Sequence, residues 1–220
     1  MKRVTIFSGH YGSGKTNVAI NYAIDLQKKG HQVSIADLDI VNTYFRTKDS
    51  ERLFEEEGIE LVALPFANTS VDLPSLPSQA YGLFDRKEKK VIIDLGGDDR
   101  GVLALGRFVP RILEENDYEM IFTVNFYRPL TTTVEEAYEV FKEIEYASRI
   151  KFTKIVNNSN LGELTKAEDV LKTVEMTKEL SSLTGVECMF TSVNESLFKE
   201  IEEKLGKGNV FPMVLQEKLF

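Results

Sequence analysis

The residues with the clearest chemical meaning form a glycine-rich segment near the amino terminus. Residues 9–16, GHYGSGKT, match the pattern G-x-x-x-x-G-K-[ST] of a phosphate-binding loop. Its three glycines allow the backbone to curl so that successive N–H groups surround one anion at the start of a helix. In this pattern Lys15 reaches the β- and γ-phosphates of a nucleotide, and the hydroxyl of Thr16 binds Mg²⁺. The predicted nucleotide contacts in this segment are Gly9, Gly12, Ser13, Gly14, Lys15, Thr16 and Asn17.

The alternative interpretation of this segment is a glycine-rich turn that binds nothing. Its surroundings argue for the phosphate-binding loop, because an apolar stretch at residues 4–7 precedes it and a helical pattern at residues 17–26 follows it.

A second chemically informative residue is Asp94, in the very apolar stretch of residues 91–95. A carboxylate at the end of such a strand holds the water shell of the metal in nucleotide-binding proteins. Asp94 and Gly97 also have the D-x-x-G spacing by which a glycine N–H senses the γ-phosphate in switch-type proteins. Buried strands often end in aspartate, so this pattern gains its meaning from the loop at residues 9–16.

Two further carboxylates, Asp37 and Asp39, follow the apolar stretch of residues 32–36. Ligands bind at the carboxyl ends of the strands in open α/β sheets, which is where these side chains are expected. The functional interpretation assigns Asp37 to the metal's water shell and Asp39 to the attacking water. The alternative is an aspartate-rich turn, since Asp is a common turn residue.

The elements that must position these residues alternate between strand and helix along the chain. Short apolar runs predict strands, and apolar residues repeating every three to four positions predict helices. We expect strands at 4–7, 32–36, 59–64, 91–95, 120–124, 154–156 and 186–190, and helices at 17–26, 50–57, 131–146, 164–183 and 196–205. The alternation predicts one α/β domain over residues 1–220, with a mostly parallel central sheet and helices on both faces. Together with the phosphate-binding loop at residues 9–16, this indicates a three-layer α/β/α P-loop NTPase fold. Pro212 confines any last strand to a sheet edge.

One segment breaks this alternation. Residues 66–79, FANTSVDLPSLPSQ, form a long connection rich in Pro and Ser. Connections of this length are often functional, so the segment is either a lid or partner-binding element, or a surface excursion without a role.

The composition limits the classes of partner. The chain of 220 residues holds 27 Lys and Arg against 35 Asp and Glu, a net charge of −8, and most of the excess lies in residues 111–220. This acidity argues against nucleic acid and anionic membrane as partners. The single cysteine, Cys188, and the absence of a signal-like or membrane-spanning run predict an unprocessed cytoplasmic protein.

The four spaced motifs together resemble the MinD/ParA/CobQ-CobB group of P-loop proteins. The resemblance is carried by GHYGSGKT, by ADLDIVN at residues 36–42, by VIIDLGG at 91–97 and by the strand that ends in Asn157. It implies a Mg²⁺- and ATP-binding switch, often dimeric, in which Thr16, Asp37 and Asp94 hold the metal and its waters. It further implies that Lys15 and Asp39 act in hydrolysis, that Asn157 reads adenine, and that Asn194 lies in the loop against the base.

The identity of the base can also be argued from the residues. A GTP site of the N-K-x-D type needs a lysine and an aspartate, and residues 156–160, Val-Asn-Asn-Ser-Asn, lack both. An asparagine amide can accept from the amino group of adenine and donate to a ring nitrogen, which favours ATP. The alternative for Asn157 is a turn after a strand.

One residue departs from the group's pattern. His10 stands where MinD- and ParA-like proteins carry a lysine that reaches the partner's nucleotide across a dimer. His10 is therefore either a partial substitute for that lysine or a loop residue without that role.

The prediction for function is a slow, Mg²⁺-dependent ATPase that acts as a nucleotide switch for a soluble protein partner, with a nucleotide-dependent homodimer. Two alternatives stay open. One is an ATP-dependent small-molecule ligase or kinase resembling dethiobiotin synthetase or the cobyrinate-amidating enzymes. The other is a weakly hydrolysing adaptor or maturation factor for a metalloenzyme.

Overall fold

The computed structural model describes residues 1–38, 50–63, 78–97, 102 and 105–214. Its strands form one eight-stranded sheet in the order β3-β2-β4-β1-β5-β6-β7-β8, and every neighbouring pair is parallel. The strands are β1 (Val4–Ser8), β2 (Val33–Leu38), β3 (Glu60–Ala63), β4 (Lys90–Leu95), β5 (Tyr118–Val124), β6 (Lys154–Asn157), β7 (Cys188–Asn194) and β8 (Val210–Met213).

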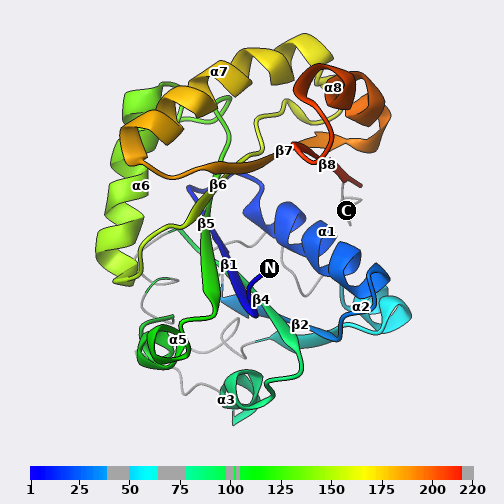
Figure 1. Cartoon of the computed structure of the whole chain (residues 1–220), viewed down its shortest axis with the longest axis vertical. Helices are drawn as coiled ribbons and strands as arrows, with labels where there is room; N and C mark the ends of the chain where they lie inside the picture. Colours follow the sequence, from blue (N-terminus) through cyan, green and yellow to red (C-terminus); the bar gives the residue numbers. More distant parts are fainter. Residues whose placement is uncertain (39–49, 64–77, 98–101, 103–104, 215–220) are drawn as a thin grey trace.

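Helices cover both faces of this sheet (Figure 1). Helices α1 (Lys15–Lys28) and α2 (Glu51–Glu57) share one apolar cluster with residues of β1, β2 and β4. The opposite face is covered by α3 (Ser78–Asp85), α5 (Val109–Glu115), α6 (Val134–Ser148), α7 (Ala167–Thr184) and α8 (Phe198–Leu205). The α/β architecture with a parallel sheet between two helical layers is therefore confirmed.

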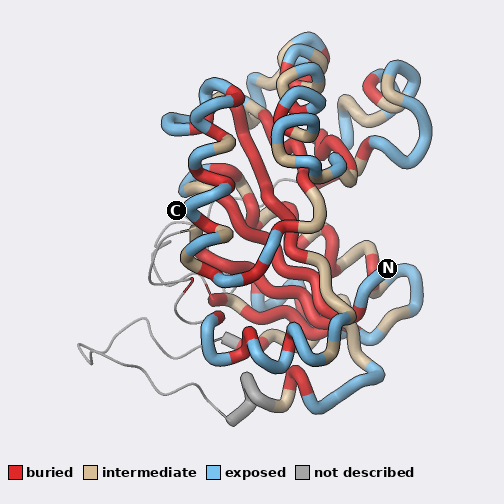
Figure 2. Tube along the Cα trace, turned by 60° about the vertical axis from the view of Figure 1, so that its left-hand side comes forward, coloured by how far each residue is buried: buried red, intermediate tan, exposed pale blue. Residues whose placement is uncertain are grey.

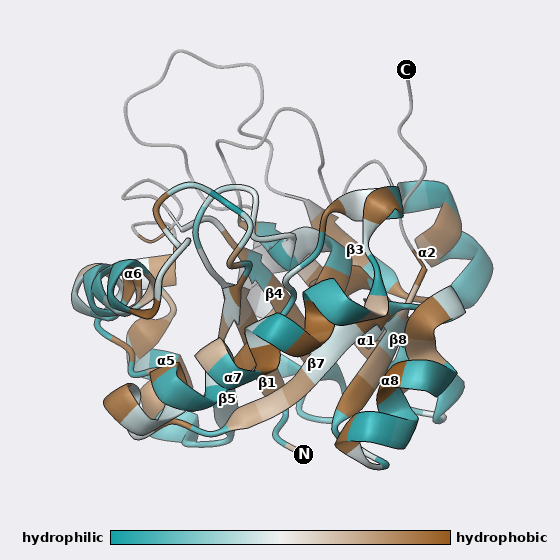
Figure 3. Cartoon of the chain, turned by 90° about the horizontal axis from the view of Figure 1, so that it is seen from above, coloured by the Kyte–Doolittle hydropathy of each residue, from teal (hydrophilic) through white to brown (hydrophobic). Residues whose placement is uncertain are grey.

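The central strands lie in the most buried part of the molecule (Figure 2). All five residues of β1 are buried, because the strand pairs with β4 on one side and β5 on the other. Hydrophobic residues line the strands, whereas the outward faces of α6 and α8 are hydrophilic (Figure 3). This is the pattern expected when helices shield a parallel sheet from water on both sides.

Aromatic packing fixes the helix that follows β1. Tyr22 of α1 makes an edge contact with Phe7, with ring centroids 5.4 Å apart, and stacks on Phe190 of β7 at 6.4 Å. Phe190 in turn stacks on Phe211 of β8 at 4.8 Å. These contacts hold α1 against β1 and against β7 and β8 at one end of the sheet, and so fix the direction in which its first turn points.

The predicted strands are present, several with wider bounds. A strand was expected at residues 32–36. The observed strand β2 continues to Leu38, because Asp37 and Leu38 pair with Asp94 and Leu95 of β4. The expectation that Pro212 lies in an edge strand is confirmed, since β8 pairs only with β7.

The helix bounds differ more from the predictions. Helix α6 begins at Val134 rather than residue 131, because Thr133 forms a capping box with Glu136. Helix α7 begins at Ala167, after a separate 3-10 turn at Gly162–Leu164. The sequence patterns did not predict α3 and α5, although α2 and α8, which are equally short, were predicted.

Two predicted features fall outside the described residues. Asp39 lies outside them, and so do residues 66–77 of the long connection, whose last two residues begin α3. Within the described ranges, none of the helices combines the length and the apolar character needed to cross a bilayer.

Candidate functional site

The loop between β1 and α1 lies at the carboxyl edge of the sheet, and its backbone forms a tight concave turn. Gly12 and Gly14 both have φ of 80°, a left-handed conformation that residues with a Cβ rarely adopt. The Ser13 N–H donates to the carbonyl of His10 at 3.0 Å, and the Val18 N–H donates to that of Gly14 at 3.1 Å, which starts the helix. Gly14 is the N-cap of α1, so the first N–H groups of the helix face the loop.

Gly9 is needed for a different reason. A Cβ at this position would overlap the carbonyl oxygen of Thr123 at the end of β5 and would lie 2.9 Å from Ser13 Oγ. The loop therefore starts in direct backbone contact with the neighbouring strand. That contact ties its position to the sheet.

The polar side chains of the loop are buried and arranged for an anion. Lys15 and Thr16 are each only 4% exposed, and Ser13 is 2% exposed. The Ser13 and Thr16 hydroxyl oxygens have no hydrogen-bond partner among the described residues. Leaving a buried hydroxyl unsatisfied costs free energy, so both atoms fit a site completed by a phosphate and its metal. The first turn of α1 holds no acidic residue that would compete for this place.

Two predicted metal-site carboxylates lie next to each other. Asp37 of β2 is the register partner of Asp94 of β4, and Asp94 is the partner of Phe7, two residues before the loop. Register partners in a parallel pair project to the same face of the sheet, here the face covered by α1. No third His, Cys, Asp or Glu within the described ranges joins them in a cluster. Two carboxylates and a hydroxyl suit Mg²⁺, which keeps several waters and takes further ligands from a nucleotide.

Gly97 brings the end of β4 against the same loop. A Cβ on Gly97 would overlap the carbonyl oxygen of Gly9, and would lie 2.8 Å from its carbonyl carbon and 3.4 Å from the Cα of His10. Only a glycine allows this backbone approach. The predicted D-x-x-G segment therefore reaches the phosphate-binding loop.

The end of β6 contributes a residue that the sequence argument missed. Asn158 is 2% exposed, and its Nδ2 donates to the carbonyl of Ser13 at 2.7 Å. Its Oδ1 accepts from the Ser192 hydroxyl at 2.6 Å. Gly14 lies against the same amide group, which would overlap any side chain at position 14. Asn158 therefore links the loop to both β6 and β7.

Asn157, the predicted base-reading residue, faces away from the loop. It is fully buried, its Nδ2 donates to the Thr173 hydroxyl of α7 at 3.1 Å, and its Oδ1 accepts from the Ser159 N–H. Because side chains alternate along a strand, Asn157 and Asn158 project to opposite faces of β6. The sequence held no signal that singled out Asn158, because Ile155 and Val156 are both apolar and only the structure shows that Val156 faces α1.

The other residues singled out in the sequence make hydrogen bonds or close contacts with their own neighbours along the chain. The Asn17 side-chain oxygen accepts from Asn21 Nδ2 at 3.2 Å, one turn further along α1. Asn194 lies at the carboxyl end of β7, where its Oδ1 accepts from the Ser196 N–H at 2.9 Å. His10 Nδ1 lies 3.0 Å from the carbonyl oxygen of Tyr11, within the loop itself.

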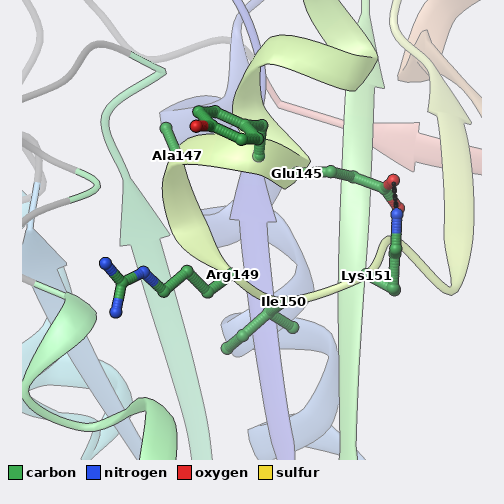
Figure 4. A pocket seen from close by; sticks show the side chains of 6 residues that line it. Glu145, Ala147, Arg149, Ile150 and Lys151 are labelled. Carbon is green, nitrogen blue, oxygen red and sulfur yellow. Dashed lines mark hydrogen bonds and ion pairs between the residues drawn. The ribbon is translucent and has the colours of Figure 1, made fainter.

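A cavity of about 500 Å³ lies elsewhere, at the turn that joins α6 to β6. Glu145 and Lys151 form an ion pair of 2.7 Å on one side of it, and the Arg149 side chain points away from that pair (Figure 4). Helix α6 runs back to the amino ends of the strands, so this cavity is at the edge opposite the phosphate-binding loop. Ligand sites of open α/β sheets lie at the carboxyl edge, which excludes the cavity as the nucleotide site.

Solved structures similar to the chain are proteins of the signal recognition particle system. Cell division protein FtsY from Thermotoga maritima superposes with a TM-score of 0.61 at 19% identity, over 89% of this chain and 63% of that one. FtsY from Mycoplasma mycoides gives 0.60 at 16% identity, over 89% and 61%. The 54 kDa signal recognition particle protein from Aeropyrum pernix, in complex with GDP, gives 0.52 at 14% identity, over 86% and 41%.

The similarity to these structures identifies the fold. The chain has the P-loop NTPase fold. They do not support the narrower assignment to the MinD/ParA group, which stays a prediction. The chain spans about 60% of the length of the FtsY structures. No protein-family model matches the sequence, and no curated protein matches it either.

Proposed function

We propose that the chain binds a purine nucleoside triphosphate with Mg²⁺ and hydrolyses it slowly, as a switch for a soluble protein partner. The observation that carries this proposal is the set of buried Ser13 and Thr16 hydroxyls, unsatisfied within the described residues, at the start of α1. Lys15 supplies a buried positive charge there, and Asp37 and Asp94 provide carboxylates at the adjoining strand ends. A phosphate and its metal would satisfy the two buried hydroxyls.

The first test is calorimetric binding of Mg-ATP to the parent and to Lys15→Ala. We expect Lys15→Ala to lower affinity by about 100-fold or more, because a buried charge-assisted contact to phosphate is lost. Lys28→Ala is the matched control, since this exposed lysine lies in the last turn of the same helix. Equal affinity of Lys15→Ala and the parent would remove the site assignment.

The nucleotide we propose is ATP. Residues 156–160 offer no lysine–aspartate pair for guanine. GTP is the competing candidate, because two of the similar structures, from Aeropyrum pernix and Elizabethkingia anophelis, are complexes with GDP. Competition of unlabelled ATP and GTP for one labelled nucleotide decides between them. The same assay on Asn157→Ala tests the proposed reading of adenine, since a base-reading role predicts a changed ATP-to-GTP preference.

Hydrolysis and its purpose need a separate assay. We expect Asp39→Ala to bind Mg-ATP but to release phosphate more slowly, because Asp39 is proposed to position the attacking water. Phosphate release that strictly requires an organic acceptor would favour the small-molecule ligase or kinase instead. Light scattering with Mg-ATP and with Mg-ADP tests the proposed nucleotide-dependent homodimer. Capture of the same protein partners in the presence of ATP and of ADP would contradict a switch.

A further inference from the structure

The turn after β5 places an arginine beside the phosphate-binding loop. Strand β5 is the neighbour of β1, and Phe122 is the register partner of Ser8, the residue before Gly9. Residues 125–130, Asn-Phe-Tyr-Arg-Pro-Leu, follow at the same edge of the sheet. Arg128 lies in this turn and is exposed to solvent. Neither the phosphate-loop motif nor the predicted carboxylates pointed to it.

The turn that carries Arg128 is held by hydrogen bonds on both sides. The Arg128 N–H donates to the carbonyl of Asn125 at 3.1 Å, and the Thr131 N–H donates to that of Arg128 at 3.2 Å. The Thr131 hydroxyl donates to the carbonyl of Asn125 at 2.8 Å, and the Phe126 N–H donates to the Ser159 hydroxyl at 3.0 Å. A turn bonded in this way to the segment that follows β6 keeps its side chains in defined positions relative to the sheet.

The side chain of Arg128 lies across Gly12. Its Cδ is 3.5 Å, and its Cγ and Nε are 3.8 Å, from the point that a Cβ on Gly12 would occupy. No carboxylate or carbonyl in the described part of the chain bonds its guanidinium. A permanent positive charge with five N–H donors therefore lies at the mouth of the anion-binding loop without a protein partner there.

We propose that Arg128 donates hydrogen bonds to the terminal phosphate of the bound triphosphate from within the same chain. This inference rests on the proposed function and names a phosphate-contacting residue for it. During hydrolysis, the oxygen of a water molecule bonds to the γ-phosphorus while the bond from that phosphorus to the β–γ bridging oxygen breaks. The bond's electron pair stays on the departing diphosphate, a proton is released to solvent, and Arg128 stabilises the negative charge on the γ-phosphate oxygens.

The side chain of His10 is directed to its own loop rather than to a ligand. Its Nδ1 lies 3.0 Å from the Tyr11 carbonyl oxygen. Arg128 instead presents a planar fork that matches two phosphate oxygens. The second charge at the phosphates then comes from the β5–α6 turn of the same molecule.

The test compares Arg128→Gln, which removes the charge but keeps most of the length, with the parent in two binding measurements. We expect the affinity for the β,γ-imido analogue of ATP to fall by about 10- to 100-fold, the range for a lost charged hydrogen bond, and that for ADP to change by less than about threefold. Single-turnover phosphate release by Arg128→Gln should also be slower than that of the parent. Arg128→Lys should recover part of both losses, because it restores the charge without the fork.

Arg149→Gln is the matched control. Arg149 is an exposed arginine at the end of α6, beside the cavity at the opposite edge of the sheet, and the same substitution there should change neither affinity (Figure 4). Equal loss of analogue and ADP binding with a lower melting temperature would assign Arg128 a structural role and overturn the inference. So would parent-like binding and hydrolysis by Arg128→Gln. A parent protein that binds no nucleotide would refute the proposed function itself and the inference with it.

Discussion

At the scale of single residues, two neighbouring asparagines show how one step along a strand changes the role of a side chain. Asn157 points into the layer under α7, where its amide bonds Thr173, whereas Asn158 points to the phosphate-binding loop. Their order in the sequence could not say which one reaches the loop. The residues before them could not say so either, because Ile155 and Val156 are both apolar and are buried on opposite faces of the sheet.

Asn158→Ala should weaken nucleotide binding without removing any nucleotide contact proposed above. The change leaves the Ser13 carbonyl and the Ser192 hydroxyl without their amide partner, and opens space beside Gly14. We expect about a 10-fold loss of Mg-ATP affinity and a destabilisation of roughly 1–3 kcal/mol from the lost buried hydrogen bonds, although the Ser192 hydroxyl keeps its bond to the Asn157 carbonyl. Calorimetry and urea unfolding measure the two effects. Asn209→Ala, whose amide bonds only the end of α8, is the control, and an unchanged affinity in Asn158→Ala would show that the loop holds its shape alone.

At the scale of elements, three of the parallel strands that form the site, β1, β4 and β5, touch through backbone atoms at or just beyond their ends. The carbonyl of Thr123 in β5 lies against Gly9, and the carbonyl of Gly9 lies against Gly97 beyond β4. The sequence predicted the strands, the phosphate-binding loop and Asp94 because each has a local pattern. It missed α3 and α5, which pack on the sheet through a few residues such as Phe84 and Ile112. It also missed the extension of β2, because that extension depends on pairing with β4, far along the chain.

Gly97→Ala should push these strand ends apart. Its new methyl group would overlap the Gly9 carbonyl, and neither backbone segment can turn away as a side chain could. We expect a loss of roughly 1–3 kcal/mol in unfolding free energy, as for other overpacked sites, together with weaker Mg-ATP binding. Thermal and urea unfolding provide the measurement.

Gly82→Ala is the control for the glycine substitution. Gly82 lies in α3 with open space where a Cβ would stand, so the change should stabilise the protein by up to about 1 kcal/mol. Similar destabilisation by both substitutions would contradict a specific contact between Gly97 and the loop.

At the scale of the whole molecule, the candidate nucleotide site lies at the carboxyl ends of the strands, and a group of ion pairs lies at the amino ends. The patterns of the sequence predicted a parallel sheet, but the order β3-β2-β4-β1-β5-β6-β7-β8 comes from long crossovers that no local pattern encodes. At the amino edge, Glu60 of β3 accepts from Lys89 and Ser34, each at 2.8 Å, and from Arg86 at 2.8 and 2.9 Å. This group ties the edge strand β3 to β2 and to the turn before β4.

The stability of the fold should therefore depend on pH through Glu60. Burial alone would raise the pKa of Glu60, but the hydrogen bonds from Lys89, Ser34 and Arg86 outweigh it and lower the pKa from 4.5 to about 2. A carboxyl whose pKa is lower in the folded state stabilises the protein above its unfolded pKa of 4.5, and this contribution is lost as pH falls toward 2. The side chain is 35% exposed, so solvent screening limits the effect at neutral pH to about 1 kcal/mol.

Glu60→Gln tests this linkage. At pH 7 the variant should be about 1 kcal/mol less stable than the parent in urea unfolding, because Lys89 and Arg86 lose their carboxylate. The difference should close as the pH is lowered from 4.5 toward 2, where the parent's own carboxyl becomes protonated. Glu55→Gln, an exposed position on α2, should stay within about 0.5 kcal/mol of the parent throughout. A difference between parent and Glu60→Gln that stays constant over this range would mean that the ion-pair group at the amino edge stabilises the sheet by packing rather than by charge.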